Sequence, residues 1–326
     1  MATYKEVIGT SITNIAGNSP TTVNGDIWYN SSATDYKFNT VLPEAWATGG
    51  NLTTARRMLG GAGTQTAGLA FGGRAPSTGT NATEEYNGSS WTNGGNMGTA
   101  KSELGGTGTQ TAGLAFGGDG PSKTNTTEEY NGSSWTGGGN LSSATNKVVG
   151  TGTQTAGLSI GGEPSGNPTA LTQEYNGSSW TAGGTLGTGR YSMGAAGTQT
   201  AALAFGGDPG KKTNTEEYNG TSWTAGGVLN TAVAEQAGFG LQTAAISAGG
   251  FSTSSPITAV TEQYDGSSWT TTANLNTARK QVAGAGSTTA GLAFAGTTAN
   301  SPSGEKSALT EEFSGGGPAT LAITTT

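Results

Sequence analysis

A nine-residue segment, Thr-Glu-Glu-Tyr-Asn-Gly-Ser-Ser-Trp, recurs along this chain at a nearly constant interval. It occurs unchanged at 83–91 and 127–135, and with one or two substitutions at 172–180, 215–223 and 261–269. A shortened sixth copy begins at Thr310 and lacks the Trp, whereas Trp46 stands ahead of the first complete copy. Successive Trp residues from Trp46 onward lie 43 to 46 residues apart. This period is typical of the blades of a β-propeller.

Each copy predicts two strands joined by a tight turn at Asn-Gly, a dipeptide that favours the positive φ angles of a type I′ hairpin. A two-residue turn would pair Tyr86 with Ser89, whereas a four-residue turn would pair Tyr86 with Trp91 directly. In both registers Tyr86 and Trp91 share one face, because side chains alternate along a strand. We therefore expect the aromatic residues of the repeat to anchor the core: Trp46, Tyr86, Trp91, Tyr130, Trp135, Tyr175, Trp180, Tyr218, Trp223, Tyr264 and Trp269.

A second repeated block, Gly-Leu-Ala-Phe-Gly-Gly at 68–73, has a counterpart in each of six cycles and predicts a strand. In the first full cycle we expect four strands, at 56–63, 66–73, 82–86 and 90–93. The sixth cycle has no Trp strand of its own, because the Gly-rich residues 315–317 stand in its place. We expect the Trp46 segment to fill that vacancy by pairing with 310–313, and the tail segment 319–323 is the rival closing strand.

These patterns predict an all-β fold, a six-bladed β-propeller of four-stranded antiparallel blades preceded by a short N-terminal β-hairpin segment. We place the propeller at 46–317, with its closing strand at 46–50, the N-terminal segment at 1–45 and a C-terminal tail at 318–326. Radial closure suits such a chain, because it leaves only short, protected strand edges.

The composition argues against several classes of function. With 59 Gly, 10 Pro and only 32% hydrophobic residues among 326, it leans toward disorder by itself. Aromatic anchors that recur in register with turn residues argue against that interpretation. A net charge of −7 without a basic run argues against nucleic-acid binding. The sequence has no Cys and no His, so we expect no thiol chemistry, no metal site and no cofactor. No apolar run reaches the roughly 20 residues of a membrane helix, so we expect no membrane insertion.

The segments 23–30 and 35–39 predict a hairpin whose arms are rich in aromatic residues. One interpretation is a small hairpin that packs on the main domain. The other is a docking element, since a lone two-stranded hairpin is barely stable without a partner. On the second interpretation the candidate assembly residues are Tyr4, Trp28, Tyr29, Tyr36 and Phe38.

A strand that ends in Gly-Gly, followed by a spacer, a Tyr and then a Trp, is the pattern of Kelch-like β-propellers, which the chain resembles over about residues 46–315. Arg56, Arg190 and Arg279 begin the first strand in blades one, four and six, as in that family. The Glu-Glu-Tyr-Asn-Gly-Ser-Ser-Trp blocks and the Ala-Asn-Leu-Asn-Thr-Ala-Arg block at 273–279 are more similar still to Kelch-like repeat proteins of marine and cyanobacterial tailed phages. Gly-Asp-Ile-Trp-Tyr-Asn at 25–30 resembles a motif common in phage fibre and other virion structural proteins.

This resemblance implies a virion component, made in the cytoplasm of an infected bacterium. We expect a tail fibre or other surface appendage whose N-terminal segment binds other virion proteins or sister chains as a homo-oligomer. We expect the propeller to contact a host glycan or an envelope protein. The rival interpretations are a glycan-degrading enzyme, sialidase-like or a depolymerase, and a purely structural capsid decoration protein.

The paired glutamates, such as Glu84 and Glu85, suggest the carboxylates of a glycosidase. However, adjacent residues of a strand point to opposite faces, so one pair cannot straddle a glycosidic bond. The pairs also recur in nearly every blade, whereas a catalytic pair occurs once. The arginines match a sialidase cluster in only three of six blades, and Asp265-Gly266 lacks the residue that separates Asp from Gly in the Asp-box of that family. We therefore predict no catalytic residues, and structural hydrogen bonding between blades for the glutamates.

The connections between the second and third strands differ in length and charge from blade to blade, whereas the Tyr-to-Trp turns are nearly uniform. In an up-and-down blade these variable connections all emerge on one face, and loops on a rigid scaffold commonly carry recognition. The alternative is relaxed drift on a solvated face. Phe251, the one aromatic residue in these connections, suits a sugar platform. The candidate binding residues are Arg74, Asp119, Lys123, Glu163, Asp208, Lys211, Lys212, Phe251, Glu305 and Lys306.

Overall fold

The structure, a computed structural model, describes residues 13–15, 27–30, 35–75, 77–298 and 305–323. Every regular element in these ranges is a β-strand, so they contain no helix long and apolar enough to cross a membrane. Contacts divide the chain into two units. One is Ala45–Ser314, and the other is Met1–Glu44 together with Gly315–Thr326.

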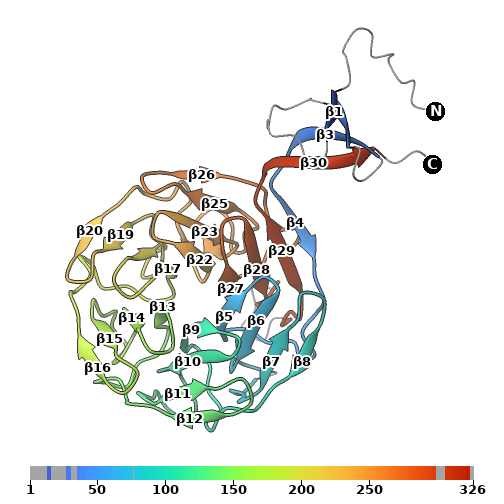
Figure 1. The fold of residues 1–326 in the computed structure, drawn as a ribbon. Helices are drawn as coiled ribbons and strands as arrows, with labels where there is room; N and C mark the ends of the chain where they lie inside the picture. The colour runs from blue at the N-terminus through green and yellow to red at the C-terminus, as the bar shows by residue number, and fades with distance from the viewer. Residues whose placement is uncertain (1–12, 16–26, 31–34, 76, 299–304, 324–326) are drawn as a thin grey trace. The chain divides into compact units, whose positions relative to one another are not determined.

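The larger unit is a six-bladed β-propeller, and each blade is a four-stranded antiparallel sheet in the part of the chain that the structure describes (Figure 1). We letter the strands of a blade a to d from the axis to the rim. The a strands are β5 (Gly60–Thr64), β9 (Gly105–Thr109), β13 (Val149–Gly152), β17 (Gly194–Gly197), β22 (Ala237–Leu241) and β27 (Ala283–Gly286). The b strands are β6 (Ala67–Phe71), β10 (Ala112–Phe116), β14 (Gly157–Ile160), β18 (Ala202–Phe205), β23 (Ala244–Ala248) and β28 (Ala290–Phe294).

The outer half of each blade is formed by the repeated nine-residue segment. The c strands are β7 (Thr83–Tyr86), β11 (Thr127–Tyr130), β15 (Thr172–Tyr175), β19 (Thr215–Tyr218), β25 (Thr261–Tyr264) and β29 (Thr310–Ser314). The d strands are β8 (Trp91–Asn93), β12 (Trp135–Gly137), β16 (Trp180–Ala182), β20 (Trp223–Ala225), β26 (Trp269–Thr271) and β4 (Ala45–Thr48).

The c–d turn has the longer of the two expected registers. Tyr86 pairs directly with Trp91, so four residues connect the strands. The side chain of Asn87 closes this turn, because its Oδ1 accepts hydrogen bonds from the backbone N–H groups of Ser89 and Ser90. Gly88 has a φ of +89°, and Asn87 has an ordinary negative φ, so the two-residue type I′ turn is not formed.

Blade six is completed by β4, as the vacancy in the repeat predicted. Trp46 pairs with Phe313 of β29, and the two ring centroids lie 5.1 Å apart. The indole Nε1 of Trp46 donates to Thr261 Oγ1 at 3.2 Å and to the carbonyl oxygen of Ala273 at 3.0 Å, both in blade five. The N-terminal strand of the propeller therefore closes the ring.

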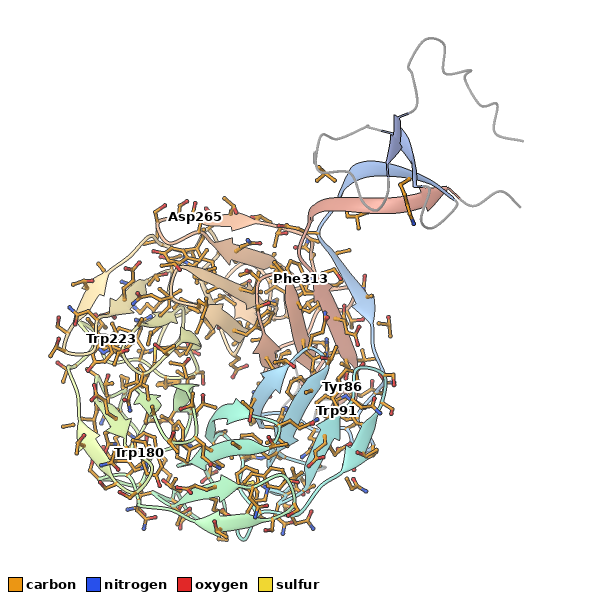
Figure 2. All side chains as sticks on the ribbon, viewed as in Figure 1. Tyr86, Trp91, Trp180, Trp223, Asp265 and Phe313 are labelled. Atoms are coloured by element: carbon orange, nitrogen blue, oxygen red, sulfur yellow. The ribbon has the colours of Figure 1, made fainter. Side chains whose placement is uncertain are left out.

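The Trp of each d strand joins its own blade to the preceding one. Trp91 packs against Tyr86 of blade one and Phe294 of blade six, with 5.0 Å between ring centroids in each case (Figure 2). Its Nε1 donates to Thr310 Oγ1 of blade six at 2.9 Å. The same bond recurs at the other interfaces, in the pairs Trp135–Thr83, Trp180–Thr127, Trp223–Thr172, Trp269–Thr215 and Trp46–Thr261.

Glycine lets the a strands crowd around the axis. A Cβ added to Gly60 would lie 2.3 Å from Cε2 of Phe71 in the same blade. One added to Gly106 would lie 2.6 Å from Cζ of Phe71 in the preceding blade. The counterpart of Gly106 in every blade is Gly or Ala. The glycine-rich composition is thus a packing requirement of blades that narrow toward the axis.

The smaller unit contains a four-stranded sheet of its own. In it β1 (Thr13–Ile15) pairs in parallel with β2 (Ile27–Asn30), which pairs antiparallel with β3 (Asp35–Leu42). The backbone pairing of β2 with β3 confirms the hairpin around 31–34. β30 (Gly317–Ile323) pairs with β3 through seven residues, so the C-terminal segment has a partner other than blade six. Tyr4 lies outside the described residues, as do the side chains of Trp28, Tyr29, Tyr36 and Phe38.

Candidate recognition face

The b–c and d–a connections meet at one end of the ring, which we term the loop face. In blade two, Ser102 N donates to Asp119 O at 2.7 Å and Asp119 N donates to Ser102 O at 2.6 Å. In blade five the pairing forms two short strands, β21 (Val233–Ala234) and β24 (Phe251–Ser252). The equivalent pairs are Arg57–Arg74, Ser102–Asp119, Asn146–Glu163, Tyr191–Asp208, Ala234–Phe251 and Lys280–Thr297.

The candidate binding residues of the b–c connections are half-buried, except for Glu305, which is exposed. Arg74 of blade one and Asp119 of blade two form an ion pair at 3.6 Å. Lys211 and Asp208 form another, at 3.5 Å within one connection. Partly exposed pairs of this kind are worth at most about 1 kcal/mol each, so they fix loop positions more than they stabilise the fold.

The remaining candidates are held mainly through the backbone. Lys123 Nζ donates to the carbonyl oxygen of Glu163 in the next blade at 2.6 Å. Lys212 and Lys306 take part in backbone bridges with Val233 and Thr297.

Phe251 carries two ammonium groups over its ring. Lys211 Nζ lies 4.1 Å and Lys280 Nζ 4.2 Å from the ring centroid, the geometry of cation–π contacts. The ring is therefore part of a local cationic cluster rather than a bare platform for a ligand.

A ring of six residues surrounds the axis on the loop face, and none of the six was predicted as a candidate from the sequence. Each member stands two residues before the first residue of strand a, and all have left-handed φ angles between +51° and +61°. A backbone N–H of each blade donates to the carbonyl oxygen of the preceding blade's member, at 2.7 to 3.3 Å, and the six bonds form a closed circle. The members of this axial ring are Met58, Glu103, Lys147, Ser192, Glu235 and Gln281.

Left-handed φ is costly for non-glycine residues, by about 1–2 kcal/mol each. The closed circle of hydrogen bonds gives a physical reason for this conformation, because it satisfies one donor and one acceptor in every blade. The backbone is therefore the same in all six blades, while the side chains differ in size and charge. The sequence does contain a trace of this. A residue that varies among blades stands just before Leu59, Leu104, Val148, Met193, Gln236 and Val282.

The axial ring surrounds a cavity of about 120 Å³, which we term the axial mouth. Its floor is the set of residues that follow the ring members, and five of these six are apolar. Gln236, in blade five, is the polar exception and is only 5% exposed. Below the floor, the a strands line a second cavity of about 220 Å³, mostly with Gly, Ala and Thr residues and also with Val149 and Phe239.

Charges at the axial mouth influence one another. Burial raises the pKa of Glu103, and the nearby positive charges of Lys147 and Arg74 oppose that rise. Burial also lowers the pKa of Arg57, and the repulsion of Arg74 adds to it, while Glu235 and Glu103 act in the opposite direction. The loop face thus contains coupled charges of both signs that come from different blades.

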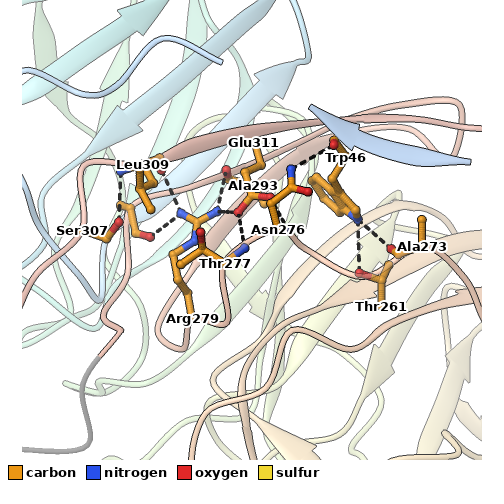
Figure 3. A network of polar contacts seen from close by, with 11 residues as sticks. Trp46, Thr261, Ala273, Asn276, Thr277, Arg279, Ala293, Ser307, Leu309 and Glu311 are labelled. Atoms are coloured by element: carbon orange, nitrogen blue, oxygen red, sulfur yellow. Dashed lines mark hydrogen bonds and ion pairs between the residues drawn. The ribbon is translucent and has the colours of Figure 1, made fainter. Parts of the chain in front are cut away.

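The first glutamate of each repeated pair lies inside its own blade. Arg279 is fully buried, and its guanidinium donates to Glu311 Oε1 at 3.0 Å and to the carbonyl oxygens of Ala295 and Leu309 at 2.8 Å (Figure 3). Glu311 also accepts from the backbone N–H of Asn276 at 2.6 Å. Equivalent ion pairs are Arg56–Glu84, Lys101–Glu128 and Arg190–Glu216.

The second glutamate of each pair bonds to the following blade. Tyr130 Oη of blade two donates to Glu85 Oε1 of blade one at 2.5 Å, and Tyr86 Oη of blade one donates to Glu312 Oε1 of blade six at 2.5 Å. The prediction of hydrogen bonding between blades is confirmed for this glutamate. The other pairs are Tyr175–Glu129, Tyr218–Glu174 and Tyr264–Glu217.

Two of the exceptions to these patterns occur in matched pairs. In blade three, Thr145 stands at the Arg position, and the partner glutamate is replaced by Gln173. At the interface between blades five and six, Phe313 has no hydroxyl, and the glutamate that would accept its proton is replaced by Gln263. At these two places a buried carboxylate is absent where its donor is absent, which agrees with the cost of an uncompensated buried charge.

Blade five differs, because Val233 stands at the Arg position while Glu262 is kept and is 2% exposed. There the carboxylate accepts hydrogen bonds from the backbone N–H groups of Asn230 and Thr231, at 2.7 and 2.8 Å.

We expect the stability of the protein to fall steeply between about pH 10 and pH 12. Burial and the hydrogen bond to Glu312 raise the pKa of Tyr86 to about 12. Burial and a hydrogen bond to the glutamate of the preceding blade likewise raise the pKa values of Tyr130, Tyr175 and Tyr264 to about 12. Tyrosine in the unfolded chain titrates near about pH 10, so the folded state retains protons that the unfolded state has lost. This contribution is complete below pH 10 and is lost as the pH approaches 12.

Urea denaturation followed by Trp fluorescence at each pH measures this loss. The matched control is the double variant Tyr86→Phe with Glu312→Gln, which copies the Phe313–Gln263 arrangement of blade six. It should reduce the slope of stability against pH by about one proton. A free energy of unfolding that stays constant from pH 9 to pH 12 would contradict the proposed contribution of the buried tyrosines.

The described residues contain no group of three or more acidic side chains that is arranged to hold a metal ion. The interacting charges of different blades thus lie on the loop face, whereas the repeated glutamates bond to partners within and between blades. No model of a known protein family matches this sequence, and a comparison with curated proteins finds no match either.

Proposed function

We propose that the chain is a non-enzymatic structural protein of a phage virion, a tail fibre or similar surface appendage, whose loop face recognises the host surface. The observation that carries the recognition role is the distribution of variation among the blades. The b–c connections and the axial ring of the loop face differ from blade to blade. In contrast, the five c–d turns at the opposite end share one sequence pattern and one hydrogen-bonding scheme. The virion assignment rests on the sequence resemblance.

The scaffold suits this role. The six blades are held together by the same Trp-to-Thr bond at every interface, and the backbone at the axial ring is the same in all six. Side chains can therefore change on the loop face without changing the fold beneath them. Variable residues on a rigid scaffold are the usual arrangement of a recognition surface.

The positions of the acidic residues support a non-enzymatic role. Glu84 and Glu85 each have a structural partner, Arg56 in the same blade and Tyr130 in the next. A glycosidase needs two carboxylates about 5–10 Å apart on either side of one bond, with at least one of them able to exchange protons with substrate. Glutamates that are engaged in this way in blade after blade are poor candidates for such a pair.

We propose that the smaller unit attaches the protein to other virion proteins or to sister chains. Its β-sheet is formed from the two ends of the chain, so it is a separate folding unit from the propeller. Several copies on one particle would increase adsorption by avidity, even where each contact with a host glycan or envelope protein is weak. The propeller alone, residues 45–314, should then fold but fail to join particles.

Replacing the b–c connections tests the recognition role. Grafting residues 208–214 into the equivalent positions of the other five blades should leave folding intact and reduce adsorption to host cells. The control changes the opposite end of the ring, with Asn87, Asn131 and Asn176 each replaced by Lys. Loss of adsorption in the control alone would show that the other face binds.

Two further results would replace the proposal. Release of sugar from host polysaccharide by the purified protein would favour the hydrolase. A location over the whole capsid, with no binding to cells, would favour a decoration protein.

A further inference from the structure

We propose that the axial mouth binds one neutral sugar ring, a hexopyranose unit of a host-surface glycan. This inference rests on the proposed role in host recognition and assigns both the ligand class and the place where it binds. It moves the specific contact from the outer b–c connections to the axial ring and its floor.

The first argument is a surplus of hydrogen-bond acceptors. Gln236 Nε2 donates to the carbonyl oxygen of Phe205 at 3.0 Å, which fixes the orientation of the amide because a carbonyl accepts and cannot donate. Gln236 is one of the residues that line the axial mouth, and its Oε1 is buried and without a donor among the described residues. Gln281 repeats this arrangement, since its Nε2 donates to Glu235 Oε1 at 3.2 Å and its own Oε1 has no donor.

Two neighbouring groups share the same deficit. Asn146, next to Lys147 of the axial ring, donates through Nδ2 to Glu103 Oε2 at 2.7 Å, and its Oδ1 has no donor. Glu235 Oε2 also has no hydrogen bond in the described part of the chain. Buried acceptors without donors are costly, so a ligand rich in hydroxyl groups would gain from satisfying them.

The second argument is that the charges at the mouth are already balanced. Three charged side chains line it, Glu103, Lys147 and Glu235. Lys147 forms a short ion pair with Glu163, and Glu235 lies 4.0 Å from Lys280. Glu103 accepts a hydrogen bond from Asn146 and interacts electrostatically with the positive charges of Lys147 and Arg74. A charged ligand would find each of these groups already paired, whereas a neutral donor would find the free amide oxygens.

The third argument is the apolar side of the cavity. Met58 of the axial ring lines it, and the floor residues other than Gln236 are apolar. A pyranose has C–H faces that pack on such a surface while its hydroxyl groups reach polar atoms. At about 10–15 Å³ for each water-sized probe, a cavity of about 120 Å³ holds several waters, so one sugar ring is the matching size and an oligosaccharide is too large.

Saturation-transfer NMR on the full-length protein tests the ligand class. The probes are the methyl glycosides of glucose, galactose and mannose, with glucosamine as a cationic and glucuronic acid as an anionic counterpart. We expect at least one neutral glycoside to bind, and more tightly than the charged sugars. Binding confined to the charged sugars, or to none of the probes, overturns the inference.

Two variants test the place. Gln236→Val copies Val148 and Val282 of other blades, and Gln281→Met copies Met58, so both should keep the fold. Each should weaken glycoside binding at least tenfold. Leu241→Thr should not, because Leu241 is exposed at the opposite end of strand a and the change copies Thr64 and Thr109 of other blades. Unchanged binding in both correctly folded variants overturns the inference.

The adsorption assay separates this inference from the proposed function. If grafting residues 208–214 abolishes adsorption while Gln236→Val adsorbs normally and no glycoside competes, the loop face is the recognition surface and the sugar site is wrong. If glycosides bind and Gln236→Val removes that binding, yet neither protein change affects adsorption, the sugar site stands and the role in host recognition fails.

Discussion

A protein shortened to residues 51–314 should lose the cooperative melting of the closed ring, whereas residues 45–314 should melt as the complete propeller does. The two proteins differ only by the segment that contains β4. That strand pairs with β29 through four residues, and the indole of Trp46 lies between Phe313 and Phe239. Without β4, blade six has three strands and its c strand has an open edge.

The expected effect is large because Trp46 is only 6% exposed. Burial of a Trp removes about 150–250 Å² from water, which is worth up to about 4–6 kcal/mol at 25 cal/mol per Å². That is a large fraction of the stability of an ordinary domain, about 5–15 kcal/mol. The hydrogen bonds from Trp46 Nε1 to Thr261 and Ala273 add to the loss, since both acceptors lie in the neighbouring blade.

Calorimetry of the two shortened proteins measures the effect, with full-length Trp46→Ala as an intermediate case. We expect a sharp fall in melting temperature for 51–314 and a smaller fall for Trp46→Ala. Equal melting of 51–314 and 45–314 would show that β4 does not hold the ring closed.

The sequence predicted the blades well because the repeat reports local physics and long-range packing together. Tyr86 and Trp91 repeat in register with Asn-Gly, so their pairing and their shared face follow from strand geometry. The closing role of Trp46 followed from counting the strands of each cycle. The last cycle lacked a d strand, and one extra d strand preceded the first cycle. Even there, propensity favoured the wrong turn, because the side chain of Asn87 closes a four-residue connection instead.

The axial ring could not be predicted from local sequence patterns. Its left-handed backbone is stabilised by hydrogen bonds between consecutive blades, and the circle exists only when all six blades are assembled. Nothing in the sequence around Glu103 or Lys147 marks such a conformation, since neither residue favours positive φ. The b–c connections were easier to find because they vary in length, whereas the axial ring varies only in side-chain type. Of the candidate sugar contacts, Gln281 belongs to the axial ring and Gln236 directly follows its member Glu235.

The C-terminal segment shows a different limit. Residues 319–323 have the composition of a strand, and sequence alone offered β29 as one partner. The segment pairs with β3 instead, in a sheet that joins the two ends of the chain. Which of two available edges a strand joins depends on the competition for those edges, and β4 already occupies the edge of β29.

The ion pair of Arg56 with Glu84 should be worth far more than any on the loop face. Arg56 is fully buried and Glu84 is 1% exposed, with 2.9 Å between Arg56 Nη2 and Glu84 Oε1. Arg56→Thr should therefore destabilise the protein by about 3–5 kcal/mol, because it leaves a buried carboxylate without its cation.

Blade three supplies the matched control for that change. There Thr145 and Gln173 occupy the two positions, and Gln173 Oε1 accepts from the backbone N–H of Ser142 at 2.9 Å. In blade one, Glu84 Oε2 accepts from the backbone N–H of Thr53 at 2.6 Å, so an amide in its place can keep the equivalent bond. The double variant Arg56→Thr with Glu84→Gln should thus recover more than half of the stability that the single variant loses. Urea denaturation at pH 7 compares the two, and a double variant no more stable than the single one would show that the buried charge is not what the arginine is needed for.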